Sequence, residues 1–364
     1  MKSSRSTALA TLFLWIIALA ILTAPGAVCA ATWRATVGAQ STDEGIQALA
    51  FLPNGLWIHA LDSITWTFPA PEIHTVTFLK QDTNPEQIRP NRPGVPGGGC
   101  PGMPNTTPDN SSFDGSTCLT SPELVNGDTY TVNFPTAGNF KLVCLVHNNM
   151  TGAVHVLDPS EPLPHNQAFY DKQARKRQAE LLSDGAVLDD LATDTAKQSS
   201  GDAVSVGIGE IVATGDGSDT VSVMRFRQDT IRVRVGDTVE WTNLDPVTPH
   251  TVTFGFPIEP TPPQPPLPPP PFGVTVDTDG ARHATLASTA DNLHSGFLVA
   301  ALQDRGPPPP TLLPPEPPPA VAPLAQSPLT VTRFRVTFTK PGIFNYRCVL
   351  HDDLGMVGQV IVHR

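Results

Sequence analysis

The sequence predicts an all-β protein with two β-sandwich domains, a partly helical linker between them and a proline-rich insertion in the second domain. The length of 364 residues suits two or at most three domains of ordinary size. The 40 prolines argue against many long helices. Short runs rich in Val and Thr, bounded by turn residues, are typical of the strands of a sandwich.

The first 30 residues are predicted to be a signal peptide. Lys2 and Arg5 precede an apolar stretch, Pro25 and Gly26 break it, and small residues end at Ala30. We therefore expect a periplasmic or secreted protein with no stable membrane span after cleavage. The alternative is an uncleaved anchor, because the apolar stretch approaches the ~17 to 25 residues that span a bilayer.

Composition divides the rest of the chain into two domains and a linker. The predicted segments are the first domain at 31–158 with a loop insertion at about 80–128, the linker at 159–202, and the second domain at 203–364 with an insertion at about 257–328. In the linker, residues 167–182 are expected to form a short helix that ends near Asp184 and Gly185, and its basic cluster is expected to be a solvated face. In the second insertion, two proline-rich stretches at 257–271 and 307–328 are expected to be extended and partly disordered, around a more structured piece at 273–301.

Two pairs of segments repeat between the halves of the chain. Residues 66–78 read WTFPAPEIHTVTF and residues 241–254 read WTNLDPVTPHTVTF. Further on, residues 138–152 read GNFKLVCLVHNNMTG and residues 342–358 read GIFNYRCVLHDDLGMVG. The same residue types recur in the same order, which indicates a tandem repeat.

Strand periodicity places each repeated cysteine at the inner edge of a core. Phe140, Leu142 and Cys144 alternate with Lys141 and Val143. In the second half, Phe344, Tyr346 and Cys348 alternate with Asn345 and Arg347. Because side chains alternate between the two faces of a strand, each cysteine is expected on the same face as the large apolar residues before it.

Each half also carries one Cys, two His and one Met in a fixed order. The two sets are His74, Cys144, His147 and Met150, and His250, Cys348, His351 and Met356. A thiolate and two imidazoles with a weak thioether suit copper, because sulfur stabilises Cu(I) while the nitrogens also accept Cu(II). The sequence therefore predicts two copper sites, each of which exchanges one electron.

These residues resemble the cupredoxin family of type 1 blue copper proteins. The loop CVLHDDLGM of the second half is similar to that of plastocyanin, and CLVHNNM of the first half is similar to the shorter amicyanin loop. The resemblance covers roughly residues 32–157 and 203–364, and it implies a Greek-key β-sandwich in each half. Thr75 and Thr251 stand where some relatives have Asn, so the hydrogen bonding of the Cys sulfur is expected to differ.

The resemblance also implies where electrons enter and leave. In the family, the ring edge of the His in the Cys-x2-His loop faces solvent, so His147 and His351 are the expected ports. Asp352 and Asp353 follow His351, whereas Asn148 and Asn149 follow His147. We therefore expect the second port to attract a cationic partner more strongly.

The remaining cysteines are predicted to form a disulfide bond. Cys29 leaves with the signal peptide, while Cys100 and Cys118 lie in one loop rich in Gly, Pro, Asn and Ser. An oxidising compartment favours their pairing. The alternative is two free surface thiols.

The charge and the histidine pattern limit the functions. A net charge of −11 disfavours nucleic acid and favours a basic redox protein as partner. The leading prediction is an exported electron carrier and not an enzyme. Copper storage or delivery is an alternative, and a two-domain copper oxidase or nitrite reductase is another. That enzyme would need a second copper centre, but Val143 and Arg347 precede the ligand cysteines and no His-x-His occurs.

Overall fold

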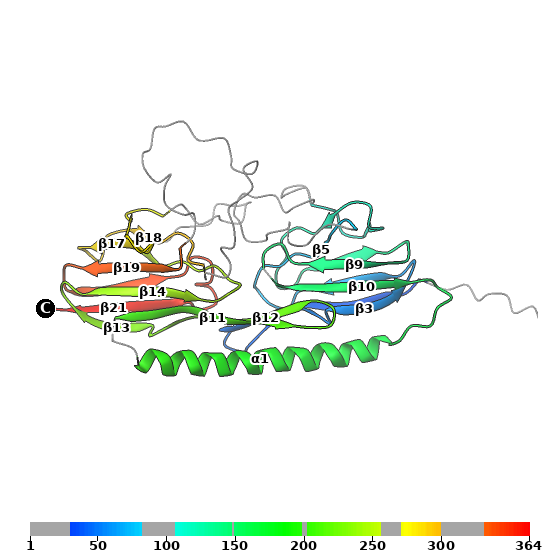
Figure 1. Ribbon diagram of the computed structural model, residues 1–364, viewed down its shortest axis with the longest axis horizontal. Coiled ribbons are helices and arrows are strands. Elements are labelled where there is room, and N and C mark those ends of the chain that lie inside the picture. The colour runs from blue at the N-terminus through cyan, green and yellow to red at the C-terminus, as the bar shows by residue number, and fades with distance from the viewer. Residues whose placement is uncertain (1–29, 82–105, 148, 199–201, 256–270, 300–330) are drawn as a thin grey trace, which may run out of the picture.

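The computed structural model describes residues 30–81, 106–147, 149–198, 202–255, 271–299 and 331–364. It shows two β-sandwiches side by side and one long helix that runs along both of them (Figure 1). This confirms the predicted fold class. The predicted signal peptide lies outside the described residues, apart from Ala30. No helix among the described residues is long and apolar enough to cross a membrane.

Strand pairing builds the first sandwich from two layers. One layer contains β1 (Thr32–Gln40), β2 (Ile46–Leu52), β4 (Ser63–Thr67), β8 (Thr129–Asn133) and β6 (Ser111–Ser112). The other contains β3 (Gly55–His59), β10 (Thr151–Leu157), β9 (Gly138–Val143), β5 (Thr77–Phe78) and β7 (Leu119–Thr120). Trp66 of β4 contacts Phe78 of β5, with ring centroids 5.7 Å apart, so the core lies between the layers.

The second sandwich has the same pairing pattern. One layer contains β11 (Ala203–Ala213), β12 (Ser218–Arg227), β14 (Thr238–Leu244), β19 (Arg333–Phe338), β17 (Arg282–Leu286) and β16 (Thr275–Val276). The other contains β13 (Thr230–Arg234), β21 (Val357–His363), β20 (Gly342–Arg347), β15 (Thr253–Phe254) and β18 (Leu293–His294). Here Trp241 of β14 contacts Phe254 and Tyr346 of the opposite layer. Each half therefore buries one Trp at the equivalent place in its core.

Parts of both predicted insertions belong to the sheets. In the first half, β6 pairs with β8 and β7 pairs with β5, so the loop predicted at 80–128 is only partly a loop. In the second half, the piece predicted to be more structured contains β16, β17 and β18. The two proline-rich stretches lie almost entirely outside the described residues.

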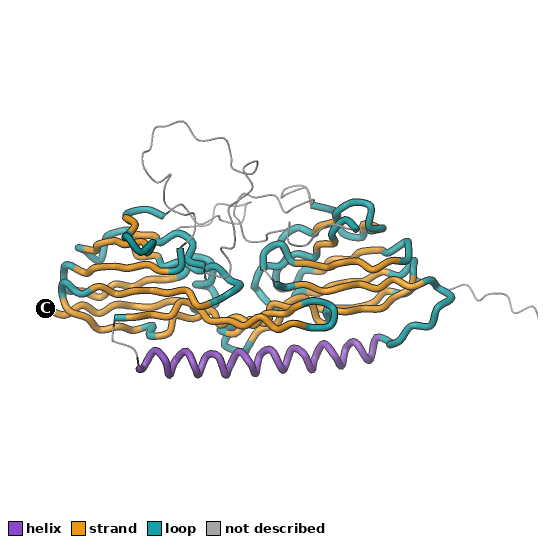
Figure 2. The backbone as a smooth tube through the Cα atoms, in the orientation of Figure 1, coloured by secondary structure: helices purple, strands orange, loops and turns teal. Residues whose placement is uncertain are grey.

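The two sandwiches share one continuous sheet. Strand β12 of the second half pairs antiparallel with β2 of the first, from Thr220 opposite Leu49 to Val223 opposite Ile46. The start of the same strand also reaches β10, where Ser218 lies opposite Thr151. Figure 2 shows these strands crossing from one half to the other. The sequence did not predict this pairing.

The linker helix is longer than predicted. Helix α1 runs from Gln167 to Gln198 and does not end near Asp184 and Gly185. At its start, the Asn166 side chain accepts a hydrogen bond of 3.0 Å from the backbone N–H of Phe169, as an N-cap does. A Cβ at Gly185 would lie 2.3 Å from Ile46 Cγ2 and 2.7 Å from Val221 Cγ2. The glycine therefore permits close packing on the sheet and does not stop the helix.

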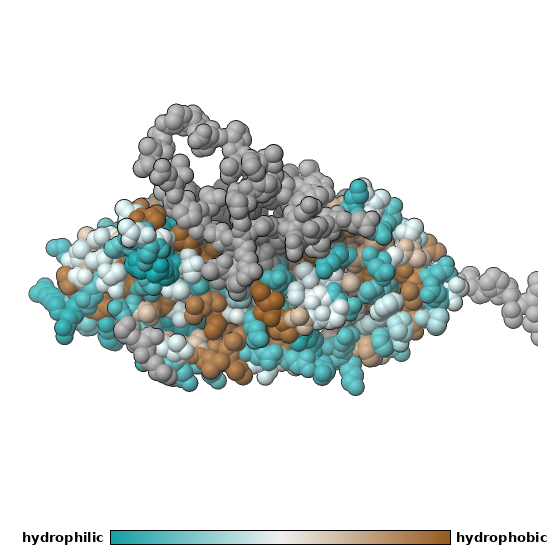
Figure 3. Space-filling model, viewed as in Figure 1, coloured by the Kyte–Doolittle hydropathy of each residue, from teal (hydrophilic) through white to brown (hydrophobic). Residues whose placement is uncertain are grey.

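Helix α1 contacts both halves at their junction. Leu181 packs on a layer of small residues, Ala39, Ala48 and Ala50, in a cluster that also includes Val221 of the second half. The basic cluster of the helix is only partly the solvated face that we expected, because Arg177 Nε lies 2.6 Å from Oδ2 of the buried Asp219. The face seen in Figure 3 is mostly polar, with a hydrophobic patch towards its middle beside α1.

Candidate metal centres

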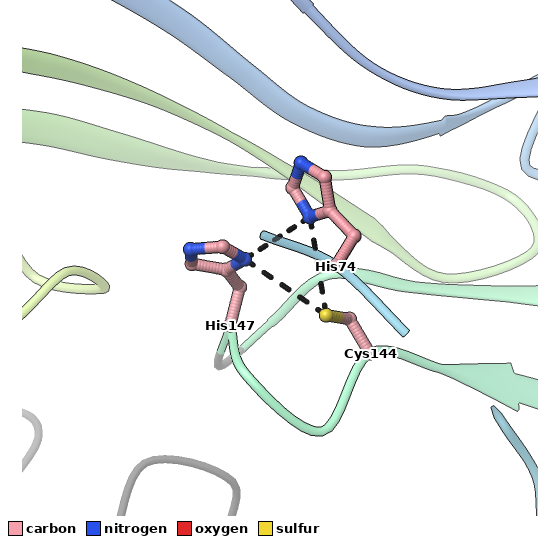
Figure 4. A group of neighbouring side chains, drawn as sticks. All are labelled: His74, Cys144 and His147. Atoms are coloured by element: carbon pink, nitrogen blue, oxygen red, sulfur yellow. Dashed lines mark hydrogen bonds between the residues drawn. The ribbon is translucent and has the colours of Figure 1, made fainter. Parts of the chain in front are cut away.

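The first candidate centre brings together three of the four predicted ligands of the first half. His74 comes from the loop after β4, while Cys144 and His147 come from the loop after β9. The Nδ1 atoms of the two histidines are 3.1 Å apart, and Cys144 Sγ lies 4.0 Å from His74 Nδ1 and 3.8 Å from His147 Nδ1. Figure 4 shows the three side chains converging on one point. All three are buried.

The second candidate centre repeats this geometry. His250 Nδ1 and His351 Nδ1 are 3.1 Å apart, and Cys348 Sγ lies 3.9 Å from the first and 3.4 Å from the second. These three side chains are also buried. Each histidine therefore presents its Nδ1 atom to the cysteine of its own half.

The donor atoms fit a single metal ion in each half. Bonds of about 2.0 to 2.3 Å from one ion to nitrogen and sulfur leave donor atoms roughly 3 to 4 Å apart, as observed. Burial alone raises the pKa of Cys144 and Cys348, but the nearby histidines lower both pKa values well below the ordinary value. A buried thiolate with two imidazoles is the donor set that copper prefers.

Met150 and Met356 lie at the ends of the two ligand loops. Both side chains are fully buried. Their backbone oxygens accept hydrogen bonds from the cysteine N–H groups, with distances of 3.0 Å from Cys144 and 3.1 Å from Cys348. These bonds close each loop and bring the backbone of the methionine to that of the cysteine.

Two threonines support the cysteine sulfurs and the loops that follow them. The N–H groups of Thr75 and Thr251 each donate to the cysteine sulfur of the same half, at 3.4 Å. The Thr75 hydroxyl accepts a hydrogen bond of 2.8 Å from the N–H of Leu145, and Thr251 accepts one of 2.9 Å from Val349. Each threonine side chain therefore binds the residue after the cysteine.

Two glycines that the sequence did not single out make room for the remote histidines. A Cβ at Gly38 would lie 2.6 Å from His74 Nε2, and one at Gly207 would lie 2.4 Å from His250 Nε2. Both have positive φ, +72° and +63°, at irregularities in β1 and β11. Both follow a valine in the first strand of their half, a signal visible in the repeat.

Two carboxylates beside the sites were also missed. Glu72 and Asp245 occupy the loops that lead to the remote histidines. Asp245 Oδ2 lies 3.5 Å from His250 Nε2 in its own half, and two backbone N–H groups, those of Val247 and Thr248, hold its other oxygen. Glu72 instead contacts His147, the ligand from the other loop, at 3.0 Å.

The expected solvent-facing ports are not solvent-facing in the structure. The exposed fractions of His147 and His351 are 2% and 4%. The reason is that Nε2 of each ring faces the Glu72 carboxylate, which comes from the same half as His147 and from the other half for His351. The charge near the second port is also reduced, since Asp352 Oδ2 forms a 2.7 Å ion pair with Arg347.

The other cysteines and histidines are separate from the two clusters. Cys118 is disulfide-bonded, and Cys100, its expected partner, lies outside the described residues. Among the described residues, Cys144 and Cys348 are the free cysteines. The remaining histidines lie outside both clusters, in strands at positions 59, 155, 283, 294 and 363 and before helix α1 at position 165.

Several solved copper proteins are similar to part of the chain. A reduced Cu(I) form of an amicyanin mutant is 17% identical over 35% of this chain and 82% of its own, with a TM-score of 0.22. A purple cupredoxin from Nitrosopumilus maritimus is 19% identical over 44% and 98%, with a TM-score of 0.20. The oxidised plastocyanin from Dryopteris crassirhizoma is 16% identical over 44% and 99%, with a TM-score of 0.21. No protein-family model and no curated protein matches the chain.

Proposed function

We propose that this chain is an exported two-domain cupredoxin that carries electrons through two type 1 copper sites. The observation that carries the proposal is the convergence of one cysteine sulfur and two histidine Nδ1 atoms in each half, 3.1 to 4.0 Å apart. In this proposal, Met150 and Met356 are the axial ligands of the two copper sites. Copper bound in such a site supplies a reversible one-electron couple.

The residues of the chain keep both sites rigid and dry. The ligand loops are closed by the bonds from Cys144 to Met150 and from Cys348 to Met356, and the N–H groups of Thr75 and Thr251 support the sulfurs. A ligand set that is fixed before the metal changes charge needs little rearrangement. This rigidity supports electron transfer over copper delivery, which requires that ligands open to release the metal.

The partner and the compartment are further parts of the proposal. The N-terminal segment supports export to the periplasm or beyond the cell. The net charge of −11 supports a basic redox protein as partner. The proposal contains the two type 1 sites and no additional, catalytic copper centre. We therefore propose an electron carrier and not an enzyme.

Copper titration followed by visible spectroscopy tests the proposal. We expect the mature chain to bind two copper ions and to show an intense visible band from charge transfer between thiolate and Cu(II). Cys144→Ser and Cys348→Ser are each expected to remove about half of this band and one copper ion, since each removes one thiolate.

The two single variants serve as controls for each other. Loss of the whole band in one single variant would mean that only one half binds copper as a type 1 site. A wild-type chain that binds copper without the band would contradict the proposed site type, and a chain that gives up copper quickly to a chelator would favour storage or delivery.

A further inference from the structure

Glu72 lies between the two candidate metal centres. Its Oε1 atom is 3.0 Å from Nε2 of His147, and its Oε2 atom is 3.9 Å from Nε2 of His351. One carboxylate thus faces a ligand histidine from each half of the chain. Its exposed fraction is only 8%.

A buried carboxylate needs partners of opposite polarity. The Glu72 carboxylate accepts a hydrogen bond from Nε2 of His147 and lies 3.9 Å from Nε2 of His351. Unpaired, such a charge would cost several kcal/mol in the protein interior. The carboxylate is therefore held at the junction by both histidines.

The two halves use the equivalent loop differently. Asp245 of the second half contacts His250 of the same half, at 3.5 Å. Glu72 of the first half reaches His147 and, in the second half, His351. Among the ion pairs of the described residues, Glu72 is the carboxylate that contacts a candidate ligand histidine from each half.

The contact with His147 also defines the state of that ring. Nδ1 of each histidine faces its own cysteine, and Nε2 faces Glu72. An N–H at Nε2 of His147 that donates to the carboxylate leaves Nδ1 free of a proton and able to bind a metal. At 3.9 Å from His351 Nε2, the carboxylate acts on the second ring through its charge and not through a hydrogen bond.

We propose that Glu72 is a shared positioning residue that acts on both metal centres. Its negative charge stabilises the more positive, oxidised state of each centre, so that one carboxylate lowers both reduction potentials. This inference rests on the proposed function and adds to it, because it gives the two centres a common electrostatic partner.

Midpoint potentials of single-site chains test whether Glu72 acts on each centre. In full-length Cys348→Ser the first centre is measured, and in full-length Cys144→Ser the second, each by spectroelectrochemistry with and without Glu72→Gln. We expect Glu72→Gln to raise the potential of both centres, by about tenfold in the one-electron equilibrium constant at the first centre, or ~59 mV. The second centre is expected to change in the same direction by less, because its histidine is farther away.

Two further variants separate a shared charge from a general structural effect. Glu72→Asp keeps the charge, so both potentials are expected to stay close to their wild-type values. Glu123→Gln is the matched control, because Glu123 is a partly buried carboxylate of the first half beside Leu124, whose backbone pairs with that of His74. It is expected to move the first potential and leave the second unchanged. A shift at the first centre alone with Glu72→Gln would overturn the proposal.

A measurement on zinc-loaded protein keeps the inference testable if Glu72→Gln does not fold or if the copper assignment fails. In the full wild-type chain loaded with Zn(II), nitrogen-15 NMR is expected to show slowly exchanging Nε2–H protons on both His147 and His351. Glu72→Asp should move both resonances. A change of the His147 resonance alone with Glu72→Asp would overturn the shared role, whereas absence of the copper band together with a change of both resonances would overturn only the proposed function.

Discussion

At the scale of single residues, small side chains decide whether the ligand histidines fit. Gly38 and Gly207 combine two requirements, a positive φ and open space beside an imidazole. The first requirement favours glycine at any turn. The second is specific to the metal centres, because a Cβ would overlap the ring of His74 or His250.

We predict that Gly38→Ala damages the first centre. The new Cβ would lie 2.6 Å from His74 Nε2, so the ring must move away from the position that binds the metal. In a Cys348→Ser background, the charge-transfer band of the first centre should shift or disappear. Gly207→Ala should do the same to the second centre in a Cys144→Ser background.

Gly127→Ala and Gly236→Ala are the matched controls. Both positions have positive φ, +92° and +97°, and nothing lies within 4 Å of a Cβ built there. Each should therefore cost about 1 to 2 kcal/mol of stability through backbone strain and leave the band unchanged. Equal spectral effects of test and control variants would show that the space beside the histidines is unimportant.

At the scale of elements, the sequence predicted the features that depend on neighbours along the chain, namely the alternation of the strands and the start of the helix. Alternation along β9 and β20 placed Phe140 and Phe344 in the cores, and the cysteines that follow these strands are buried with them. The linker helix was placed correctly at its start, but its end was wrong. A glycine usually lowers helix stability, and only the neighbours of Gly185 explain why the helix continues.

We predict that Gly185→Ala destabilises the protein, although the same change in an exposed helix is stabilising by about 1 kcal/mol. The added methyl group would meet Ile46 and Val221, two β-branched side chains that cannot easily turn away. Overpacking of this kind costs about 1 to 3 kcal/mol, measured by urea unfolding. Asp184→Ala, at the exposed neighbouring position, is the control and should leave stability equal or slightly higher.

The sequence could predict the candidate metal ligands but not the contacts between the two halves. Each ligand set lies in short segments that the repeat shows twice, so His74 and His250 were found with their cysteines. The pairing of β2 with β12 joins residues about 170 positions apart that have no repeated counterpart. The contact of Glu72 with His351 depends on that docking, which no local pattern specifies.

At the scale of the whole molecule, the shared sheet and helix α1 make the two halves one folding unit. Strand β12 belongs to the second sandwich and extends the sheet of the first. Helix α1 packs on β1 and β2 of the first half and on β11 and β12 of the second. Neither half can lose these strands without exposing apolar surface of the other, so the two candidate metal centres are held at a fixed relative position.

We therefore predict a single cooperative unfolding transition that depends on the ion pair between Arg177 of the helix and Asp219 of β12. Asp219 has an exposed fraction of 1%, and burial raises its pKa even with Arg177 beside it. Arg177→Ala leaves this carboxylate without its charged partner. Loss of one partner of a buried pair costs about 3 to 5 kcal/mol, and the partial exposure of Arg177 reduces the expected loss to about 2 kcal/mol.

Lys176→Ala is the matched control for this last prediction. Lys176 is the neighbouring residue, has an exposed fraction of 75%, and pairs only with Glu180 of the same helix among the described contacts. Exposed pairs of this kind contribute little, so its removal should hardly change the midpoint of unfolding. Urea unfolding, followed by fluorescence and by the copper band, tests whether the two halves unfold in one transition. Coincident transitions with a large effect of Arg177→Ala alone support one folding unit, whereas two separate transitions in the wild-type chain would mean that each sandwich unfolds independently.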